Sequence, residues 1–229
     1  MILKYAVYIL SLFFVLIILG LLIEPVKVSN VDISTYRDPF LMVREAYAKA
    51  VWNELDKQKD NNKKFLVVQR VLSYSPSFKL AYDELCSNVD AYKASNVSTR
   101  DLLKLLKQGA ETFDDLYFTD CYVFTLTNMQ RYIEALSFLN QRYVQEPNAK
   151  PQEMIMGMIK KIQNEKNMLD LAKAVETYYQ KNKAYPGDIL VLVKDSLINR
   201  IPEEPYGGQY FISLQGQIKT TSEMTKNEQ

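Results

Sequence analysis

The side chains that perform most enzyme chemistry are scarce in this sequence. Histidine is absent, which removes the commonest general base and the commonest zinc ligand. The two cysteines, Cys86 and Cys121, stand apart from any ligand cluster and cannot form a zinc site alone. Among carboxylate pairs, Asp114-Asp115 suits a helix N-terminus and Glu203-Glu204 an exposed turn. We therefore expect no catalytic residue, no metal ligand, no cofactor, and a protein that is not an enzyme.

Phosphate and nucleic-acid ligands are also disfavoured. Only seven glycines occur, and Gly207-Gly208 precedes an expected strand rather than a helix, so no phosphate-binding loop is found. Lys plus Arg number 28 against 27 Asp plus Glu, whereas a nucleic-acid binder normally has a basic surplus or stripe. The composition predicts no nucleic-acid partner and no small-molecule substrate.

The clearest signal lies at the N-terminus. Residues 5–23 (YAVYILSLFFVLIILGLLI) are nineteen residues without a charge, and roughly twenty apolar residues cross a bilayer as a helix. A cleaved signal peptide is the alternative, but its apolar region is usually shorter and ends in a small-x-small site, which is missing here. We expect residues 1–23 to be a transmembrane anchor. Its characteristic residues are Tyr5, Tyr8, Phe13, Phe14, Leu19 and Ile23.

The rest of the chain is predicted to be mainly helical. Residues 24–38 suit an extended tether, and Asp38-Pro39 is a helix start signal. Helices are expected at about 39–57, 65–75, 77–93, 99–108, 114–126, 128–145, 151–165 and 167–182, with a charged loop at 57–64. Ser98 should cap the helix that Gly109 ends. The short joints indicate stacked antiparallel helix pairs, with a generic helical bundle as the alternative.

The C-terminal part has a different pattern. Residues 185–188 (YPGD) form a turn signal, and residues 189–198 are apolar enough for a short helix. Residues 209–220 alternate around Gln215-Gly216, which predicts a small β-hairpin. The polar residues 221–229 are expected to be a disordered tail.

Several spacings in the helical part match a known repeat. Ala81, Tyr82, Leu85 and Cys86 have the pattern of a first helix, and Met156-Gly157 follow Pro147 as Leu85-Cys86 follow Pro76. The second helix and closing proline are matched by Tyr132, Ala135, Leu139 and Pro147. Residues 39–166 thus resemble tetratricopeptide repeats, arrays of helix pairs about 34 residues long. Arg142 and Lys64 depart from the pattern, because the family usually has small residues there.

A second resemblance covers about residues 169–214. Tyr178-Tyr179 run into Tyr185-Pro186, and Pro205, Tyr206, Gly207 and Gly208 lead to Tyr210. Both segments are similar to the C-terminal part of the type II secretion major pseudopilin, which implies a helix-plus-hairpin module over 167–220. That family has its cleavage glycine before the apolar helix, whereas Gly20 and Glu24 come at its end. No acidic calcium-binding loop is found either, so we expect a module on a repeat protein rather than a filament subunit.

The repeat alignment also makes a prediction about the cysteines. Cys86 and Cys121 fall at nearly equivalent places on neighbouring first helices, whose axes lie about 8–10 Å apart. A disulfide needs Cα atoms within roughly 7 Å and side chains that point at one another. We expect two buried, reduced thiols close to each other; a disulfide, the alternative, requires an oxidising compartment.

The aromatic residues Phe113, Tyr117, Phe118, Tyr122 and Phe124 form a cluster in the sequence. Such residues either line a binding groove or, as we expect here, pack between helices.

These features predict a membrane-anchored, non-enzymatic scaffold that presents a helical-repeat surface to protein partners. Positive charges flank the apolar run on both sides and leave its orientation open. The pseudopilin resemblance implies a bacterial envelope or secretion-related setting, with the N-terminus cytoplasmic and the soluble domain periplasmic. A pseudopilin-like structural subunit of a filament is the alternative. An enzyme acting on lipid or envelope polymer is the least favoured.

Overall fold

The computed structural model describes residues 40–224. The expected anchor, the tether, the Asp38-Pro39 helix start and residues 225–229 of the expected tail lie outside the described residues. Within residues 40–224, no helix combines the length and apolar character needed to cross a bilayer. This part of the chain is mainly helical and contains a two-stranded antiparallel hairpin. It divides into two compact units, and the boundary between them in the sequence falls within one helix, between Tyr122 and Val123.

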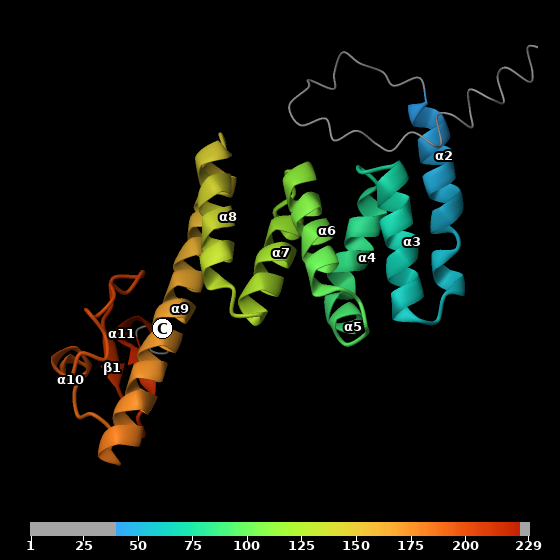
Figure 1. Cartoon of the computed structure of the whole chain (residues 1–229). Helices are drawn as coiled ribbons and strands as arrows, with labels where there is room; N and C mark the ends of the chain where they lie inside the picture. Colours follow the sequence, from blue (N-terminus) through green and yellow to red (C-terminus); the bar gives the residue numbers. More distant parts are fainter. Residues whose placement is uncertain (1–39, 225–229) are drawn as a thin grey trace, which may run out of the picture. The chain divides into compact units, whose positions relative to one another are not determined.

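The described elements of the first unit are α2 (Leu41–Trp52), the 3-10 turn η1 (Leu55–Lys57), α3 (Asn61–Tyr74), α4 (Lys79–Ser87), α5 (Val89–Lys93), α6 (Thr99–Thr112) and the start of α7 (Leu116–Asn128). In the first unit the helices follow one another with short connections, and α2, α3, α4 and α6 reverse direction from one to the next, with the short α5 between α4 and α6 (Figure 1). The second unit contains the end of α7, α8 (Tyr132–Gln145), α9 (Ala149–Asn182), α10 (Leu190–Lys194), β1 (Tyr210–Ile212), β2 (Ile218–Thr220) and α11 (Thr221–Met224).

Side-chain caps fix two helix starts in the first unit. The Ser98 hydroxyl accepts a hydrogen bond from the Asp101 N–H, so the predicted start of α6 is confirmed. The Asp60 carboxylate accepts from the Lys63 N–H and begins α3 at Asn61. The charged loop predicted over 57–64 is therefore wrong in its second half, because the cap turns those residues into a helical turn.

The prediction that Gly109 ends α6 is wrong. The helix continues to Thr112, and Gly109 is buried inside it. A Cβ atom at Gly109 would lie 2.6 Å from Cδ1 of Tyr82 on α4. The glycine is thus required by the close approach of α4 to α6 rather than by a helix end.

The break expected near residue 166 is also wrong, because α9 is one continuous helix of 34 residues. No proline or glycine occurs at residues 165–167, and two contacts cross the expected break. Lys166 pairs with Asp170 at 2.8 Å, and the Gln163 amide donates to Asn167 at 2.8 Å. Such i,i+4 contacts stabilise a helix. Pro151 is tolerated because it lies in the first turn, where its missing N–H has no helical partner.

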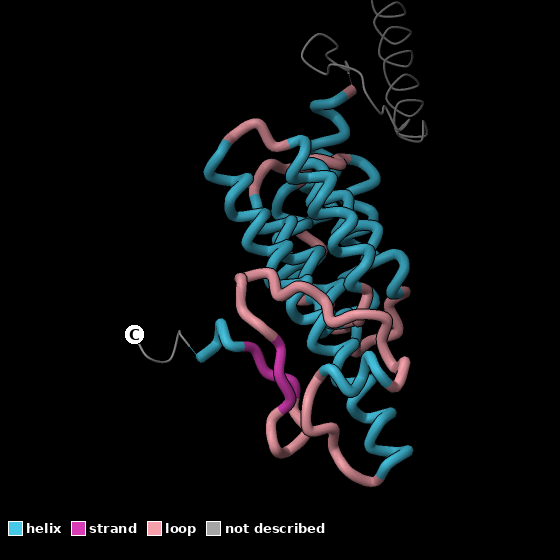
Figure 2. The backbone as a smooth tube through the Cα atoms, turned by 90° about the vertical axis from the view of Figure 1, so that its left-hand side faces the viewer, coloured by secondary structure: helices cyan, strands magenta, loops and turns pink. Residues whose placement is uncertain are grey.

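The hairpin predicted over 209–220 is confirmed (Figure 2). Tyr210 pairs with Thr220 and Ile212 with Ile218, and Gly216 makes the turn at a φ of +76°. The short helix expected at 189–198 is confined to Leu190–Lys194. Together α9, α10 and the hairpin enclose one core, which consists of Leu171, Ala174, Val175, Ile189, Leu192, Tyr210 and Ile218.

Candidate interaction surfaces

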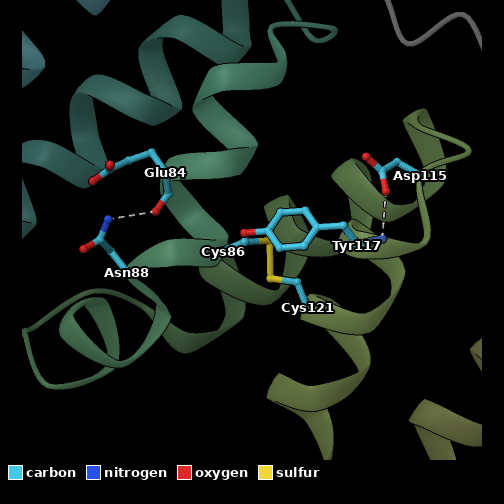
Figure 3. Close-up of a disulfide and its surroundings, with 6 residues drawn as sticks. All are labelled: Glu84, Cys86, Asn88, Asp115, Tyr117 and Cys121. Atoms are coloured by element: carbon cyan, nitrogen blue, oxygen red, sulfur yellow. Dashed lines mark hydrogen bonds between the residues drawn. A yellow bond between two sulfur atoms is a disulfide. The ribbon is translucent and has the colours of Figure 1, made fainter. Parts of the chain in front are cut away.

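A disulfide joins the first unit's helices α4 and α7. Cys86 and Cys121 are bonded, with their Cα atoms 5.8 Å apart (Figure 3). The predicted proximity of the two residues is confirmed. The prediction of buried, reduced thiols is wrong, because both residues are half-buried and neither thiol is free. The error lies in the rotational position of each helix about its axis. The two Cα atoms lie within the limit of roughly 7 Å, and the two side chains point toward each other, which the sequence spacing did not predict.

The start of α7 is held against α4 by Asp115, as the helix N-terminus prediction requires. Its Oδ1 accepts from the Tyr117 N–H at 3.0 Å, and its Oδ2 accepts from Lys79 Nζ at 3.2 Å. The Tyr117 N–H, and after it the Lys79 ammonium, hold the pKa of the Asp115 carboxyl below its usual value. Lys79 also lies 5.5 Å from the centre of the Phe118 ring. Asp115 therefore has a structural role.

Most of the aromatic cluster packs between helices, as expected. The Tyr82 ring centre lies 5.6 Å from that of Phe113 and 6.2 Å from that of Phe118. The Tyr82 hydroxyl donates to the Pro76 carbonyl at 2.8 Å, and burial raises the pKa of this phenol. Tyr122 is buried too, whereas Tyr117 and Phe124 are exposed. The packing interpretation is thus confirmed for the inner members, whereas Tyr117 and Phe124 remain exposed on the surface.

Exposed apolar residues of the first unit concentrate on one class of helix. We call α2, α4 and α7 the first helices, because they alternate along the chain with the longer helices α3 and α6. Five exposed large apolar residues lie on them, Leu41, Met42, Tyr47, Leu80 and Tyr117, and we name this set the first-helix surface. Among residues 40–122, Leu66 on α3 is the other exposed large apolar residue. Aromatic residues and methionine are enriched at protein interfaces.

Half of the ten residues of the repeat pattern are buried. Ala81, Tyr82 and Leu85 are buried in the first unit, and Ala135 and Leu139 in the second. Tyr132 and Met156 are half-buried, and Pro147 is exposed between α8 and α9. Gly157 is exposed and has no atom within 4 Å of a Cβ placed on it, so packing does not require its small size.

Buried polar groups connect α9 to the hairpin of the second unit. The Asn167 amide donates to the Glu203 carbonyl at 3.1 Å and to the Tyr210 hydroxyl at 3.3 Å. The Tyr210 hydroxyl in turn donates to Asn164 Oδ1 at 2.7 Å, and burial raises the pKa of Tyr210. These bonds satisfy groups that would be costly to bury alone and fix where the hairpin lies on α9.

Glu204 was expected in an exposed turn, which is wrong. Its side chain is buried and accepts from the Tyr206 and Gly208 N–H groups at 2.9 and 2.7 Å, and from the Ser222 hydroxyl at 2.5 Å. Gly207, at a φ of +85°, allows the turn to wrap around the carboxylate. No local sequence signal distinguishes Glu204 from its exposed neighbour Glu203.

The other pseudopilin-like residues stabilise the same module. Tyr178 packs against the core, and the Tyr179 ring stacks on Tyr185 with centres 4.7 Å apart. Pro186 is buried. Pro205 lines an open groove of about 530 Å³, together with Gln163, Lys166, Asn167, Asp170, Leu171, Ile198, Arg200, Pro202 and Glu203. The two sequence segments are therefore brought together around α9.

No cluster of three or more His, Cys, Asp or Glu residues that could hold a metal ion occurs within residues 40–224. No protein family, curated protein or solved structure matches this chain. The candidate interaction site within the described residues is the first-helix surface, because exposed apolar residues are concentrated there.

Proposed function

We propose that the chain is a membrane-anchored, non-enzymatic scaffold that binds protein partners through the first-helix surface. The observation that carries the proposal is the concentration of exposed apolar side chains on α2, α4 and α7. Arrays of helix pairs expose the same helix of each pair along one extended binding surface. The tetratricopeptide-like spacing of residues 39–166 supports this arrangement, in which the buried Ala81, Tyr82 and Leu85 stabilise the array while its exposed residues make contacts.

Charges near the first-helix surface indicate the chemistry of the partner. With α6 left out, the chain from α4 to Tyr122 carries six carboxylates and two lysines. The carboxylates are Asp83, Glu84, Asp90, Asp114, Asp115 and Asp120, and the lysines are Lys79 and Lys93. An acidic surface with exposed Leu80 and Tyr117 is complementary to a segment with apolar and basic side chains. We infer a partner of that composition.

The membrane anchor and its orientation are part of the same proposal. The uncharged run of residues 5–23 has the length of a membrane-spanning helix. The Cys86–Cys121 disulfide supports a soluble domain outside the cytoplasm, since disulfides persist in oxidising compartments. A Lys59→Cys variant places a thiol on an exposed residue. A membrane-impermeant maleimide should label it in intact spheroplasts; labelling only after lysis would reverse the orientation.

Matched surface variants test the scaffold proposal. Leu80 on α4 and Leu66 on α3 have similar exposed fractions, 56% and 61%. Proteins cross-linked to the wild-type chain in intact membranes and identified by mass spectrometry should be retained by Leu66→Asp. They should be lost from Leu80→Asp and from Tyr117→Ser. If all three variants retain the same cross-linked proteins, or all lose them equally, the first-helix surface is not the binding site.

A further inference from the structure

Charge is segregated between the helices of the first unit. Helices α3 and α6 together carry six basic and two acidic residues. The segments 79–93 and 113–122, which include α4, α5 and the start of α7, show the reverse balance of six acidic and two basic residues. The basic residues are Lys63, Lys64, Arg70, Arg100, Lys104 and Lys107, and the acidic ones are Asp101 and Glu111. The near-zero net charge of the whole chain conceals this separation.

Helix α6 shows the separation within one element. Arg100, Lys104 and Lys107 are spaced four and three residues apart, so they share one face of the helix, and all three are exposed. The opposite face buries Leu102, Leu103, Leu106, Gly109 and Ala110. Lys107 lies 3.5 Å from Glu111, whereas neither Arg100 nor Lys104 forms an ion pair within the described part of the chain. The exposed face of α6 is thus cationic.

We propose that this cationic face of α6 binds the anionic headgroups of the membrane in which the chain is anchored. The inference rests on the anchor of the proposed function. Residues 24–39 separate the apolar run from the first described residue, and sixteen extended residues reach at most about 55 Å. The first unit is therefore kept near a lipid surface, where a basic cluster is attracted to anionic lipids within a Debye length of about 8 Å.

In this proposal the cationic face of α6 and the acidic segments of the first unit bind different ligands. The cationic face of α6 meets lipid, while the acidic stretch containing Asp115 and Asp120 is repelled by it and stays available to a protein partner. Each cation near an anionic surface changes the ratio of docked to undocked first unit by about fivefold. Because Glu111 pairs with Lys107, the face has a net charge of +2 and is expected to change this ratio by roughly 25-fold.

The test uses the full chain in vesicles. A fluorophore on Thr99→Cys, an exposed residue at the start of α6, serves as donor to a headgroup-labelled lipid, because both native cysteines are bonded to each other. Energy transfer should be greater in vesicles of equal parts phosphatidylcholine and phosphatidylglycerol than in phosphatidylcholine alone. The difference should disappear at about 1 M salt, where the Debye length is about 3 Å.

Two charge-reversal variants with the same change in net charge locate the effect. R100E/K104E/K107E should abolish the difference between the two vesicles. K160E/K161E/K173E, which changes three exposed lysines of α9, should retain it. Equal transfer in both vesicles, or equal loss in both variants, would overturn the proposal while leaving the anchor intact. Failure of the wild-type chain to float with either vesicle would instead refute the anchor and this proposal with it.

Discussion

Removing the disulfide should destabilise the first unit by an amount set by the length of chain that it closes. Cys86 and Cys121 are 35 residues apart in the sequence, and closing a loop of that length restricts the unfolded chain. The chain-entropy relation gives a loss of about 4 kcal/mol at 25 °C for opening it. Both cysteine residues are half-buried, so a C86S/C121S variant leaves little cavity and the loss of the cross-link dominates.

The assay is equilibrium unfolding in urea, followed by tryptophan fluorescence. Trp52 is the sole tryptophan of the chain, and its ring centre lies 5.4 Å from that of Phe78, so it reports on the first unit. A total stability of about 5–15 kcal/mol is usual for a domain, so a loss near 4 kcal/mol moves the midpoint markedly. Dithiothreitol should lower the wild-type midpoint to that of C86S/C121S and leave the variant unchanged.

Two results would refute this reasoning. A loss below about 1 kcal/mol would show that the unfolded chain is not restricted as the loop length requires. A dithiothreitol effect on C86S/C121S equal to that on the wild type would show that the reductant acts elsewhere.

Three further predictions concern the interior of the first unit. Gly109→Ala should lower the free energy of unfolding by about 1–3 kcal/mol in the same assay, because the new methyl group meets the Tyr82 ring; an unchanged midpoint would contradict that packing. Thr119→Val should be neutral or stabilising by up to about 1 kcal/mol, because the buried Thr119 hydroxyl has no hydrogen-bond partner among the described residues; a clear loss of stability would reveal one. Burial raises the pKa values of Tyr82 and Tyr92, the latter also through the Glu84 carboxylate that its hydroxyl contacts. Since the folded-state pKa exceeds the unfolded value of about 10, stability should be constant below that pH and fall above it, by about 1.4 kcal/mol per pH unit for each tyrosine. Circular dichroism and tyrosinate absorbance would check this, and a single tyrosinate titration with its midpoint near pH 10 and no loss of helix would contradict it.

Local patterns alone predicted the class of fold and most helix starts. Ser98 caps α6 because its hydroxyl reaches a backbone N–H three residues away, and that geometry depends on no other part of the chain. The hairpin around Gly216 is equally local, since a positive φ favours glycine. The apolar spacing that buries Tyr82 and Leu85 follows from helical period.

Contacts between distant segments decided the rest. Gly109 looks like a helix end until Tyr82 is seen against it, and Glu204 looks like a surface carboxylate until Ser222 and two backbone N–H groups surround it. The repeat spacing predicted that Cys86 and Cys121 lie near each other. Whether they are bonded depends on the orientation of α4 and α7 about their own axes, which only the folded structure defines. That orientation is set by all the side chains packed between the helices, and no spacing along one helix contains it.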